Sequence, residues 1–507
     1  MSDALGLTIK PGLDLLLVEL PCRYGTMMPA GIGMMHRIAQ DAGLRVDTVD
    51  FNILLYRSFH ADRLAGGGNP RYAAARAVAG DDPWDPPVTH LWNDPALVDQ
   101  FVPELDELVA AIAAAPPRVL GLSLNGLSRI TARRVAEGIR AHFPTLPVIG
   151  GGHDCAHADG ARELLAIADH LFIQEADLTL LPVVRELLAG GRPIDHAGVL
   201  SRHDTPGRPW RPAPLAQDLD ALGFPRYDWA DGLDLYRAFD GTLVAPVLWS
   251  RGCWWSRCTF CAERFAWRAR SPAHVVDELE WFAARGCTRF QCNDSDLIGL
   301  SADTLLAIAD EIIRRKLEVR IAGQMRCHKR TDEAFFRRLR QAGFVAMRFG
   351  VDGWSDRLLR LQRKGSTIAI VERVLTASRA AGLWTSVNIV VGVPGETEED
   401  VDAMIANLIR MSPYIDNVDN FNALELPIGS LYLEEPERHA IRFRDDWKPA
   451  EDAPPRVVPG EMWYSEGPFI DEATRRRRLV RVARALARMR VSCSSFLIVR
   501  DTALAGQ

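Results

Sequence analysis

The N-terminal part of the chain alternates short apolar runs with longer stretches in which apolar residues recur at helical spacing. Residues 13–20 (LDLLLVEL) are dominated by apolar side chains, as expected of a strand covered on both faces. Strands that alternate with helices of this length predict a parallel, doubly wound (Rossmann-like) sheet. Further strands are predicted at 45–51, 118–124, 147–151 and 169–174, and helices at 29–43, 103–115, 131–142 and 178–189.

Two segments interrupt this alternation. Residues 57–100 are rich in Gly, Pro and Asp, which predicts an insertion with long loops. Residues 196–243 are rich in Pro and Arg with little periodicity, so they are predicted to be a linker. The first domain is therefore expected to span residues 1–195.

A second alternation of strands and helices follows the linker. Repeated units of this kind build a (β/α) barrel or part of one, with its active site at the carboxyl ends of the strands. Residues 244–425 are therefore predicted to form a partial (β/α)6 barrel in an α/β chain. The strands are predicted at 245–250, 289–293, 318–324, 345–351, 385–391 and 419–424, and helices at 273–285, 302–315, 332–342 and 370–381.

Residues 426–507 are predicted to be a small α-rich extension, a candidate for substrate binding, with a basic helix at 473–490. One apolar face of that helix is defined by four side chains at roughly helical spacing: Leu479, Val482, Leu486 and Met489. Arginines occupy the rest. They are interpreted as a solvated face or, alternatively, as a contact for an acidic peptide leader or a phosphorylated substrate.

Composition describes an ordinary globular protein, with 48% hydrophobic and 25% charged residues. The net charge of −6 offers no general reason to expect a nucleic acid partner. No apolar run is long enough to span a bilayer, so no membrane partner is expected. The cysteines lack the regular spacing of a disulfide framework, which favours the cytoplasm as the location.

Three closely spaced cysteines, Cys253, Cys258 and Cys261, are the strongest chemical signal in the chain. Iron–sulfur clusters are held by thiolates, normally four, so a set of three leaves one iron of a 4Fe-4S cluster open to another ligand. A structural zinc site is the alternative, but it requires a fourth Cys or His at matching spacing. The next cysteines, Cys287 and Cys292, fall in or beside a predicted strand.

This cysteine stretch resembles the cluster motif of radical S-adenosylmethionine (SAM) enzymes, in which SAM occupies the open iron. The usual gap between the first two cysteines has three residues, whereas here it has four, beginning with Trp254 and Trp255. Some branches of the family lengthen this gap and also place Trp-Trp after the first cysteine. The resemblance therefore implies a 4Fe-4S cluster and SAM as cofactors.

Upstream, the order of features resembles the cobalamin-binding domain of B12-dependent radical SAM enzymes. The matching residues are Pro29, Gly31, Gly33, the 121–123 strand end, the glycines 150–152 and residues 172–177. The Asp-x-His-x-x-Gly sequence of other B12 proteins is absent, as is usual in this branch; a degenerate domain that binds no cobalamin is the alternative. The cobalamin contacts implied are Ser123, Asn125, Gly150, Gly151 and Gly152.

The resemblance also implies SAM contacts at the strand ends of the barrel. Asp294 and Asp296 are expected near the SAM amino group, and Arg326 is suited to grip its carboxylate. Asp352 is expected near the ribose. The turn that contains Gly392 and Glu396 matches a family motif, although Glu396 is equally suited to capping the next helix. Lys364 and Gly365 also fit the family pattern, and both are expected to be exposed.

Taken together, the resemblance implies a cobalamin-dependent radical SAM methyltransferase. Such an enzyme transfers a methyl group from SAM, through methylcobalamin, to an unactivated carbon of a natural product or ribosomal peptide. A non-methylating oxidation, ring formation or rearrangement is the alternative, and a non-enzymatic metal-binding or electron-transfer protein a less favoured one. The implied partners are a small-molecule or peptide substrate and a one-electron reductant such as flavodoxin or ferredoxin. The catalytic residue is left open.

Overall fold

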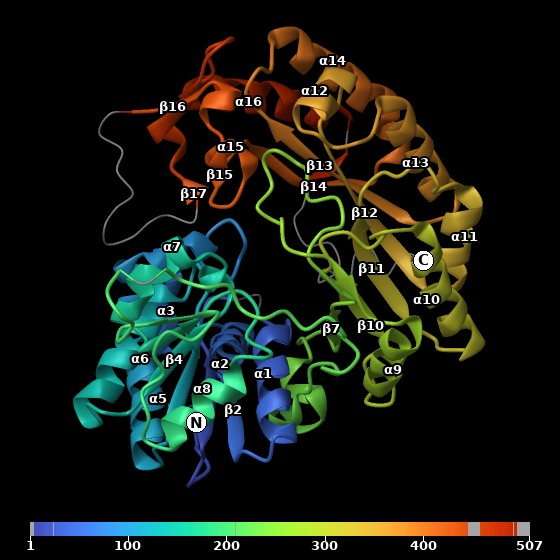
Figure 1. Cartoon of the computed structure of the whole chain (residues 1–507). Coiled ribbons are helices and arrows are strands. Elements are labelled where there is room, and N and C mark those ends of the chain that lie inside the picture. The colour runs from blue at the N-terminus through green and yellow to red at the C-terminus, as the bar shows by residue number, and fades with distance from the viewer. Residues whose placement is uncertain (1–4, 24, 208, 445–456, 490, 494–507) are drawn as a thin grey trace. The chain divides into compact units, whose positions relative to one another are not determined.

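The structure is a computed structural model that describes residues 5–23, 25–207, 209–444, 457–489 and 491–493 (Figure 1). Its internal contacts divide the chain into two compact units. Unit 1 takes the described residues of Met1–Gln217 and Ala221–Gly241, and unit 2 takes those of Asp218–Asp220, Thr242–Ala450 and Pro455–Gln507.

Unit 1 is built on a six-stranded sheet in the order β2-β1-β3-β4-β5-β6, which confirms the doubly wound fold. The first five strands are parallel, and β6 is an antiparallel edge. The strands are β1 (Leu15–Glu19), β2 (Val46–Asp50), β3 (Val119–Ser123), β4 (Val148–Gly151), β5 (His170–Phe172) and β6 (Val199–Ser201). The principal helices are α1 (Ala30–Asp41), α5 (Val102–Ala114), α6 (Arg129–His142) and α8 (Leu180–Leu188), and shorter ones are η3 (His153–Cys155), α7 (Ala158–Ala161) and η4 (Arg162–Ala166).

Both faces of this sheet are covered, as its apolar strands require. Leu16 and Val18 of β1 belong to one buried cluster with side chains of α5 and α6. Leu15 and Leu17 belong to another, with side chains of α1 and α8. Successive residues of a strand point to opposite faces, so a strand buried on both sides carries an uninterrupted apolar run.

The segment 57–100 is mostly helical, so the prediction of long loops is wrong. It contains α2 (Phe51–Leu64, which begins just before it), α3 (Pro70–Ala79), η1 (Thr89–Asn93), α4 (Pro95–Val98) and the start of η2 (Asp99–Phe101). Asn69 and Asp94 cap α3 and α4, and each is followed by a proline in the first turn. Asn69 with Pro70 and Asp94 with Pro95 therefore mark helix starts, whereas the Asp- and Pro-rich residues 81–87 do lie in turns.

The predicted linker 196–243 also differs from expectation, because it contributes elements to unit 1. It supplies the edge strand β6 and the 3-10 helix η5 (Asp228–Tyr236). Tyr236 is fully buried and donates a hydrogen bond of 2.9 Å to Asp50 at the end of β2. A buried tyrosine bonded in this way fixes its segment to the sheet.

Unit 2 is built on a curved, parallel sheet in the order β7-β10-β11-β12-β13-β14-β19, with the helices of the alternation along its outer side (Figure 1). Its six main strands match the predicted ones. They are β7 (Val244–Val247), β10 (Arg289–Cys292), β11 (Arg320–Met325), β12 (Phe344–Asp352), β13 (Trp384–Val391) and β14 (Asn417–Ala423); β19 (Ser492–Cys493) adds a short edge. The helices are α9 (Pro272–Ala283), α10 (Ala302–Arg314), α11 (Glu333–Gln341), α12 (Asp356–Leu361), α13 (Ile368–Ala380) and α14 (Glu398–Met411), followed by η6 (Ser412–Tyr414).

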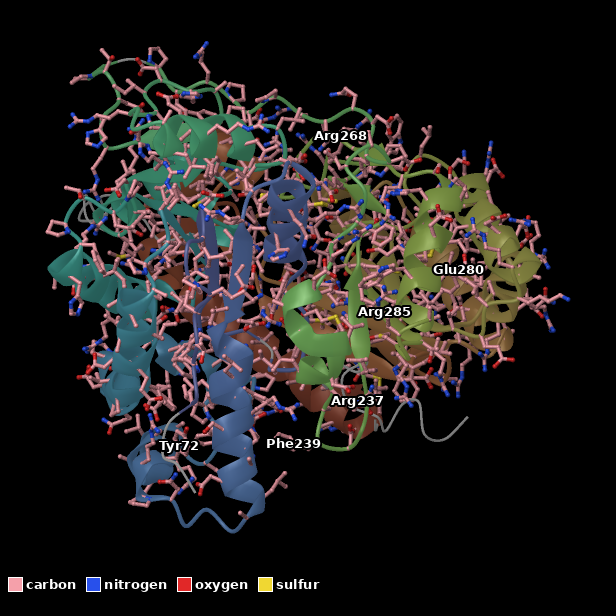
Figure 2. The ribbon with its side chains drawn as sticks, turned by 90° about the horizontal axis from the view of Figure 1, so that it is seen from below. Tyr72, Arg237, Phe239, Arg268, Glu280 and Arg285 are labelled. Atoms are coloured by element: carbon pink, nitrogen blue, oxygen red, sulfur yellow. The ribbon has the colours of Figure 1, made fainter. Side chains whose placement is uncertain are left out.

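Ion pairs and ring contacts lie on the surface of the outer helices. Arg315, at the end of α10, lies 2.6 Å from Asp277 and 3.0 Å from Glu280 of α9. Arg285 stacks over Trp281 with its guanidinium 3.9 Å from the ring centre. Figure 2 places Glu280 and Arg285 on this part of the molecule. Exposed pairs of this kind contribute at most about 1 kcal/mol each, so the apolar core carries the stability of the unit.

The C-terminal extension belongs to unit 2. Its long helix α16 (Glu472–Met489) packs against α14, and Val482 and Leu486 are buried as predicted. The interpretation of its arginines as a solvated face is wrong for Arg475 and Arg478, which are only 1% and 4% exposed. The other elements are β15 (Leu426–Pro427), α15 (Leu431–Glu434), η7 (Glu437–His439), β16 (Ile441–Phe443), β17 (Val457–Val458), η8 (Gly460–Met462) and β18 (Trp463–Ser465).

No helix in the described part of the chain is long and apolar enough to cross a membrane.

The helical segment 57–100 is expected to be part of the core of unit 1. Trp92 is fully buried, stacks on Phe101 at 5.0 Å and donates to the Pro83 carbonyl at 3.0 Å. Trp92→Ala should therefore lower the free energy of unfolding by about 3–5 kcal/mol, measured by urea denaturation with near-UV circular dichroism. Leu64→Ala is the control, because Leu64 is 70% exposed. Equal effects of the two changes would contradict this packing.

Candidate functional site

The three cysteines lie on one loop that is closed at its base by a two-stranded ladder. β8 (Ser250–Arg251) pairs antiparallel with β9 (Arg268–Ala269) on either side of the loop. Gly252 begins the loop with a φ of +73°, and a Cβ there would lie 2.5 Å from the Phe265 carbonyl oxygen. Only glycine tolerates both the conformation and this close approach.

The cysteine thiols differ in their surroundings. Cys258 is buried at 8% exposure, whereas Cys253 and Cys261 are half-buried. Burial raises the pKa of Cys258, and it raises the pKa of Cys261 to about 12 even though the Glu263 amide donates to its Sγ. Both thiols must lose a proton to bind iron, so an electrophilic partner is needed to hold the thiolates.

This donor set fits an iron–sulfur cluster. Within the described residues, no three His, Cys, Asp or Glu side chains converge as a single metal ion would require. In a 4Fe-4S cluster each thiolate binds a different iron, so its three thiolates need not meet at one point. Cys253, Cys258 and Cys261 are the residues that would hold the cluster.

Lys364 is buried beside this loop, so the prediction that it is exposed is wrong. It is 8% exposed, and its Nζ lies 2.6 Å from Oδ2 of Asp352. Burial opposes its charge, but Asp352 and the thiols of Cys258 and Cys261 raise its pKa above the ordinary value. The pairing folds α12 back onto the end of β12, which local sequence alone does not indicate.

Trp255 links the cysteine loop to two other strand-end loops. Its Nε1 donates to the Arg363 carbonyl at 2.7 Å, and a Cβ on Gly365 would lie 2.3 Å from its ring. The guanidinium groups of Arg257 and Arg326 each lie 5.2 Å from its ring centre. The next residue, Ser256, takes a left-handed φ of +44° and donates from Oγ to the Cys253 carbonyl.

Asp294 holds the start of the cysteine loop. It is 1% exposed and accepts hydrogen bonds from the Trp249 amide at 3.0 Å and the Ser250 amide at 2.5 Å, and from Ser250 Oγ at 2.6 Å. Burial raises its pKa to about 6 in spite of these donors. The carboxylate predicted to meet SAM is thus engaged by the chain itself.

The predicted residues Asp296 and Arg326 are brought together at the next strand end. Asp296 is 1% exposed, and its Oδ2 accepts from Arg326 Nε at 2.6 Å. Its Oδ1 accepts from the Arg326 amide at 3.1 Å, and Arg326 Nη2 donates to the Gly299 carbonyl at 3.4 Å. Within the described residues Nη1 of Arg326 makes no hydrogen bond, so the guanidinium keeps a donor for a further acceptor.

Glu396 closes its own turn and binds Arg478 of α16. Both of its carboxylate oxygens accept from the Gly392 amide, at 2.9 and 3.0 Å, and Arg478 Nη1 donates to its Oε1 at 3.2 Å. Burial raises the pKa of Glu396 to about 7, against the lowering effects of Gly392 and Arg478. Arg475 packs on Gly392, where a Cβ would lie 2.4 Å from its Cγ.

A polar network inside the sheet was missed by the sequence analysis. Arg348 of β12 donates from Nη1 to Asp419 of β14 at 2.6 Å and from Nη2 to Gln324 of β11. Gln324 in turn donates to the Asp294 carbonyl at 2.8 Å. The signal was a polar or charged residue within each of these predicted strands, which apolar patterning alone passes over.

The predicted cobalamin residues lie at the carboxyl ends of β3 and β4. A Cβ on Gly150 would lie 2.8 Å from Leu124, and Gly152 has a φ of +120° with the Leu124 carbonyl oxygen 2.6 Å from its Cβ position. Both are therefore required by packing. Gly151 differs, because its Cβ would meet only Phe172 at an ordinary 3.7 Å.

Ser123 and Asn125 shape the same strand ends. The Ser123 carbonyl accepts from Ser128 Oγ, and Asn125 Oδ1 accepts from the Leu127 amide at 2.9 Å. The neighbouring Glu19, at the end of β1, is 3% exposed; burial raises its pKa to about 7, while Arg23 lowers it. This edge carries several polar groups where doubly wound sheets bind ligands.

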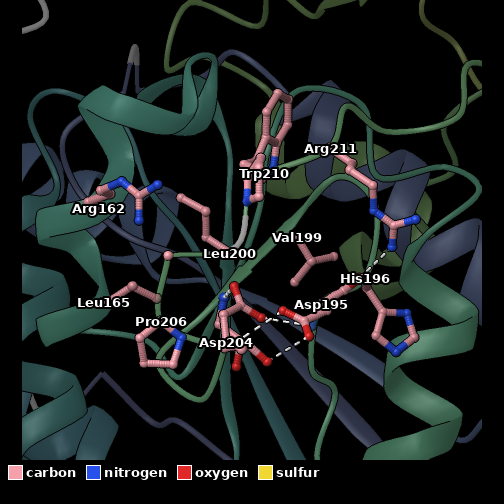
Figure 3. Close-up of a pocket in the computed structure, with 14 residues that line it drawn as sticks. Arg162, Leu165, Asp195, His196, Val199, Leu200, Asp204, Pro206, Trp210 and Arg211 are labelled. Atoms are coloured by element: carbon pink, nitrogen blue, oxygen red, sulfur yellow. Dashed lines mark hydrogen bonds between the residues drawn. The ribbon is translucent and has the colours of Figure 1, made fainter.

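Unit 1 also holds a pocket of about 380 Å³ beside the edge strand β6 (Figure 3). Asp195, His196, Trp210 and Arg211 are among its lining residues. Asp204 at its base accepts from the Asp195 amide at 2.8 Å. None of the predicted cobalamin residues lines this pocket, so it is separate from the ends of β3 and β4.

Comparison with known proteins decides the identity of the cysteine-bearing unit. The family model of the radical SAM superfamily matches residues 247–408, which include the cysteine loop and the strands from β10 to β13. This match confirms a radical SAM domain in the unit that carries the cysteine loop, as the resemblance implied.

Among curated relatives, an uncharacterized methyltransferase of Pyrococcus horikoshii is 24% identical over 323 residues, covering 62% of this chain and 69% of the relative. Among solved structures, the radical SAM methyltransferase TsrM from Kitasatospora setae, with cobalamin and a [4Fe-4S] cluster bound, has a TM-score of 0.67 at 18% identity, covering 94% of this chain and 88% of that one. The cobalamin-dependent radical SAM enzyme OxsB, with aqua-cobalamin and SAM bound, has a TM-score of 0.68 at 15% identity, covering 92% and 65%. This chain therefore has the fold of cobalamin-dependent radical SAM enzymes.

The burial of Glu396 predicts a specific pH dependence. Its pKa rises from 4.5 to about 7 on folding, so its contribution to stability is present in full below pH 4.5 and is lost as the pH rises through 7. Between these values the free energy of unfolding should fall by about 3 kcal/mol more in the wild type than in Glu396→Gln, measured by urea denaturation across pH 4.5–7.5. Identical pH profiles would mean that Glu396 ionises normally.

Proposed function

We propose that the chain is a cobalamin-dependent radical SAM methyltransferase that alkylates an unactivated carbon of a natural product or a ribosomal peptide. The observation that carries the proposal is a cysteine loop of three thiols in a chain whose fold, over nearly its whole length, is that of TsrM. The methyltransferase name of the Pyrococcus relative points in the same direction.

In this proposal Cys253, Cys258 and Cys261 hold a 4Fe-4S cluster. A reduced cluster with SAM bound supplies one-electron cleavage of SAM, and cobalamin supplies methyl transfer. The chain's own contribution is a loop held in one geometry. The Asp294 carboxylate fixes the start of the loop, and the indole of Trp255 fixes its middle.

For SAM we keep the predicted set at the strand ends, with roles set by the contacts. The Nη1 donor of Arg326 is suited to the SAM carboxylate. Asp296 orients that guanidinium by accepting from Nε, and it also accepts from the Arg326 backbone amide. Asp352 is proposed to lie near the ribose. Asp294 and Glu396 hold the loops, and Gly392 lets the turn approach closely.

For cobalamin we keep Ser123, Asn125 and Gly150–Gly152 at the ends of β3 and β4. Two of these glycines are needed for the fold, which leaves Gly151 as the residue whose missing side chain serves a ligand. The substrate is proposed to be a small molecule or peptide, and the electron to come from a flavodoxin or ferredoxin.

Cleavage of SAM is expected to depend on the cysteine loop. Anaerobic protein reconstituted with iron and sulfide should release 5′-deoxyadenosine from SAM in the presence of dithionite, and Cys258→Ala should lower this at least 100-fold. Cys287→Ala is the matched control, because Cys287 is a buried thiol outside the loop. Release that persists in Cys258→Ala would overturn the cluster assignment.

Cobalamin binding is expected to depend on the space at Gly151. Gly151→Leu should lower the bound cobalamin at least tenfold, read from the visible spectrum of protein reconstituted with hydroxocobalamin, because the longer side chain fills the strand-end space. Gly151→Ala should retain it, since that Cβ has only an ordinary contact with Phe172. Full cobalamin occupancy in Gly151→Leu would place the cofactor elsewhere.

A further inference from the structure

We infer that Lys364 is a positioning residue that holds a fixed positive charge against the cysteine loop and thereby favours the reduced state of the cluster. The inference rests on the proposed cluster site. It adds a role for a residue that belongs to neither the cysteine loop nor the predicted SAM contacts.

The backbone that carries Lys364 is bonded to the cysteine loop at three points. The Thr259 amide donates to the Gln362 carbonyl at 3.2 Å, and Thr259 Oγ1 donates to the Leu361 carbonyl at 3.3 Å. Trp255 Nε1 donates to the Arg363 carbonyl at 2.7 Å. Thr259 follows Cys258 directly, so the segment 361–363 is fixed relative to the buried thiol.

The side chain of Lys364 points back into this junction. Its Nζ lies 5.6 Å from the ring centre of Phe260, the residue immediately before Cys261. Its only ion pair in the described chain is with Asp352, at 2.6 Å. A lysine at 8% exposure has little water to screen its charge, so its field acts strongly on nearby groups.

The ammonium is the member of the pair that reaches the cysteine loop. Its Nζ lies over the ring of Phe260, between Cys258 and Cys261 in the sequence. Within the described residues, the carboxylate of Asp352 is bonded only to Lys364. The positive end of the pair therefore faces the cysteine loop.

Reduction of a cluster adds one electron and increases its negative charge. A nearby fixed cation stabilises the more negative form, and loss of the cation disfavours it. If Lys364 served only to neutralise Asp352, replacing either residue would disturb the loop. The reduction midpoint would then have no reason to move in opposite directions in the two variants. The sign of the change in reduction midpoint separates the two roles.

The test is a redox titration of the reconstituted cluster without SAM, followed by its visible absorbance and the EPR signal of the reduced form. Lys364→Met should disfavour reduction at least tenfold, a fall of about 59 mV in the one-electron midpoint. Asp352→Asn should shift the midpoint in the opposite direction, because the cation then lacks its counter-charge. Lys364→Arg should stay close to the wild type.

Lys316→Met is the matched control. Lys316 is an exposed lysine that follows α10, at the amino end of β11, so loss of its charge should leave the midpoint unchanged. If Lys364→Met does not assemble a cluster, the opposite shift in Asp352→Asn and the unchanged midpoint of Lys364→Arg carry the test. Midpoints that coincide in wild type, Lys364→Met and Asp352→Asn, or that move in the same direction in both variants, would overturn the inference. A wild-type protein that holds no cluster would instead overturn the proposed function.

Discussion

Buried carboxylates at the carboxyl ends of the unit 2 strands are the constraint on which the candidate site depends. Removing one partner of a buried pair typically costs about 3–5 kcal/mol, because an uncompensated charge remains. Asp294 is satisfied by two backbone amides and a hydroxyl, Asp296 by Arg326 and Asp352 by Lys364. Asp294 and Asp296 each join loops at least 30 residues apart in sequence, and Asp352 ties the end of β12 to the segment after α12. The strand-end loops are therefore held in position before any ligand arrives.

The C-terminal helix takes part in the same arrangement. Arg478 reaches the carboxylate and the carbonyl of Glu396, and Arg475 covers Gly392 while its guanidinium lies 3.6 Å from the ring centre of Trp463. An arginine that donates to buried carbonyls and stacks on an aromatic ring contributes to packing as well as carrying a charge. The extension is thus a structural part of the turn after β13.

Sequence patterning predicted the strands well because a parallel strand buried on both faces must be apolar throughout. It predicted the cysteine loop because the three cysteines that would bind the cluster stand in one short stretch of sequence. Lys364 was placed wrongly, since the burial of a lysine depends on a carboxylate that reaches it only after folding. The prediction of long loops over residues 57–100 was wrong for a related reason. Asn, Asp and Pro begin helices as readily as loops, and the helical form here is the one that buries the ring of Trp92.

The left-handed backbone at Ser256 has a consequence for the length of the cysteine loop. The turn lets four residues bridge Cys253 and Cys258 while the indole of Trp255 reaches the bare backbone at Gly365. The length of the gap, the tryptophan at 255 and the glycine at 365 are therefore expected to change together among relatives. A relative that shortens the gap has no reason to keep a glycine at position 365, and one that fills position 365 must redirect its indole.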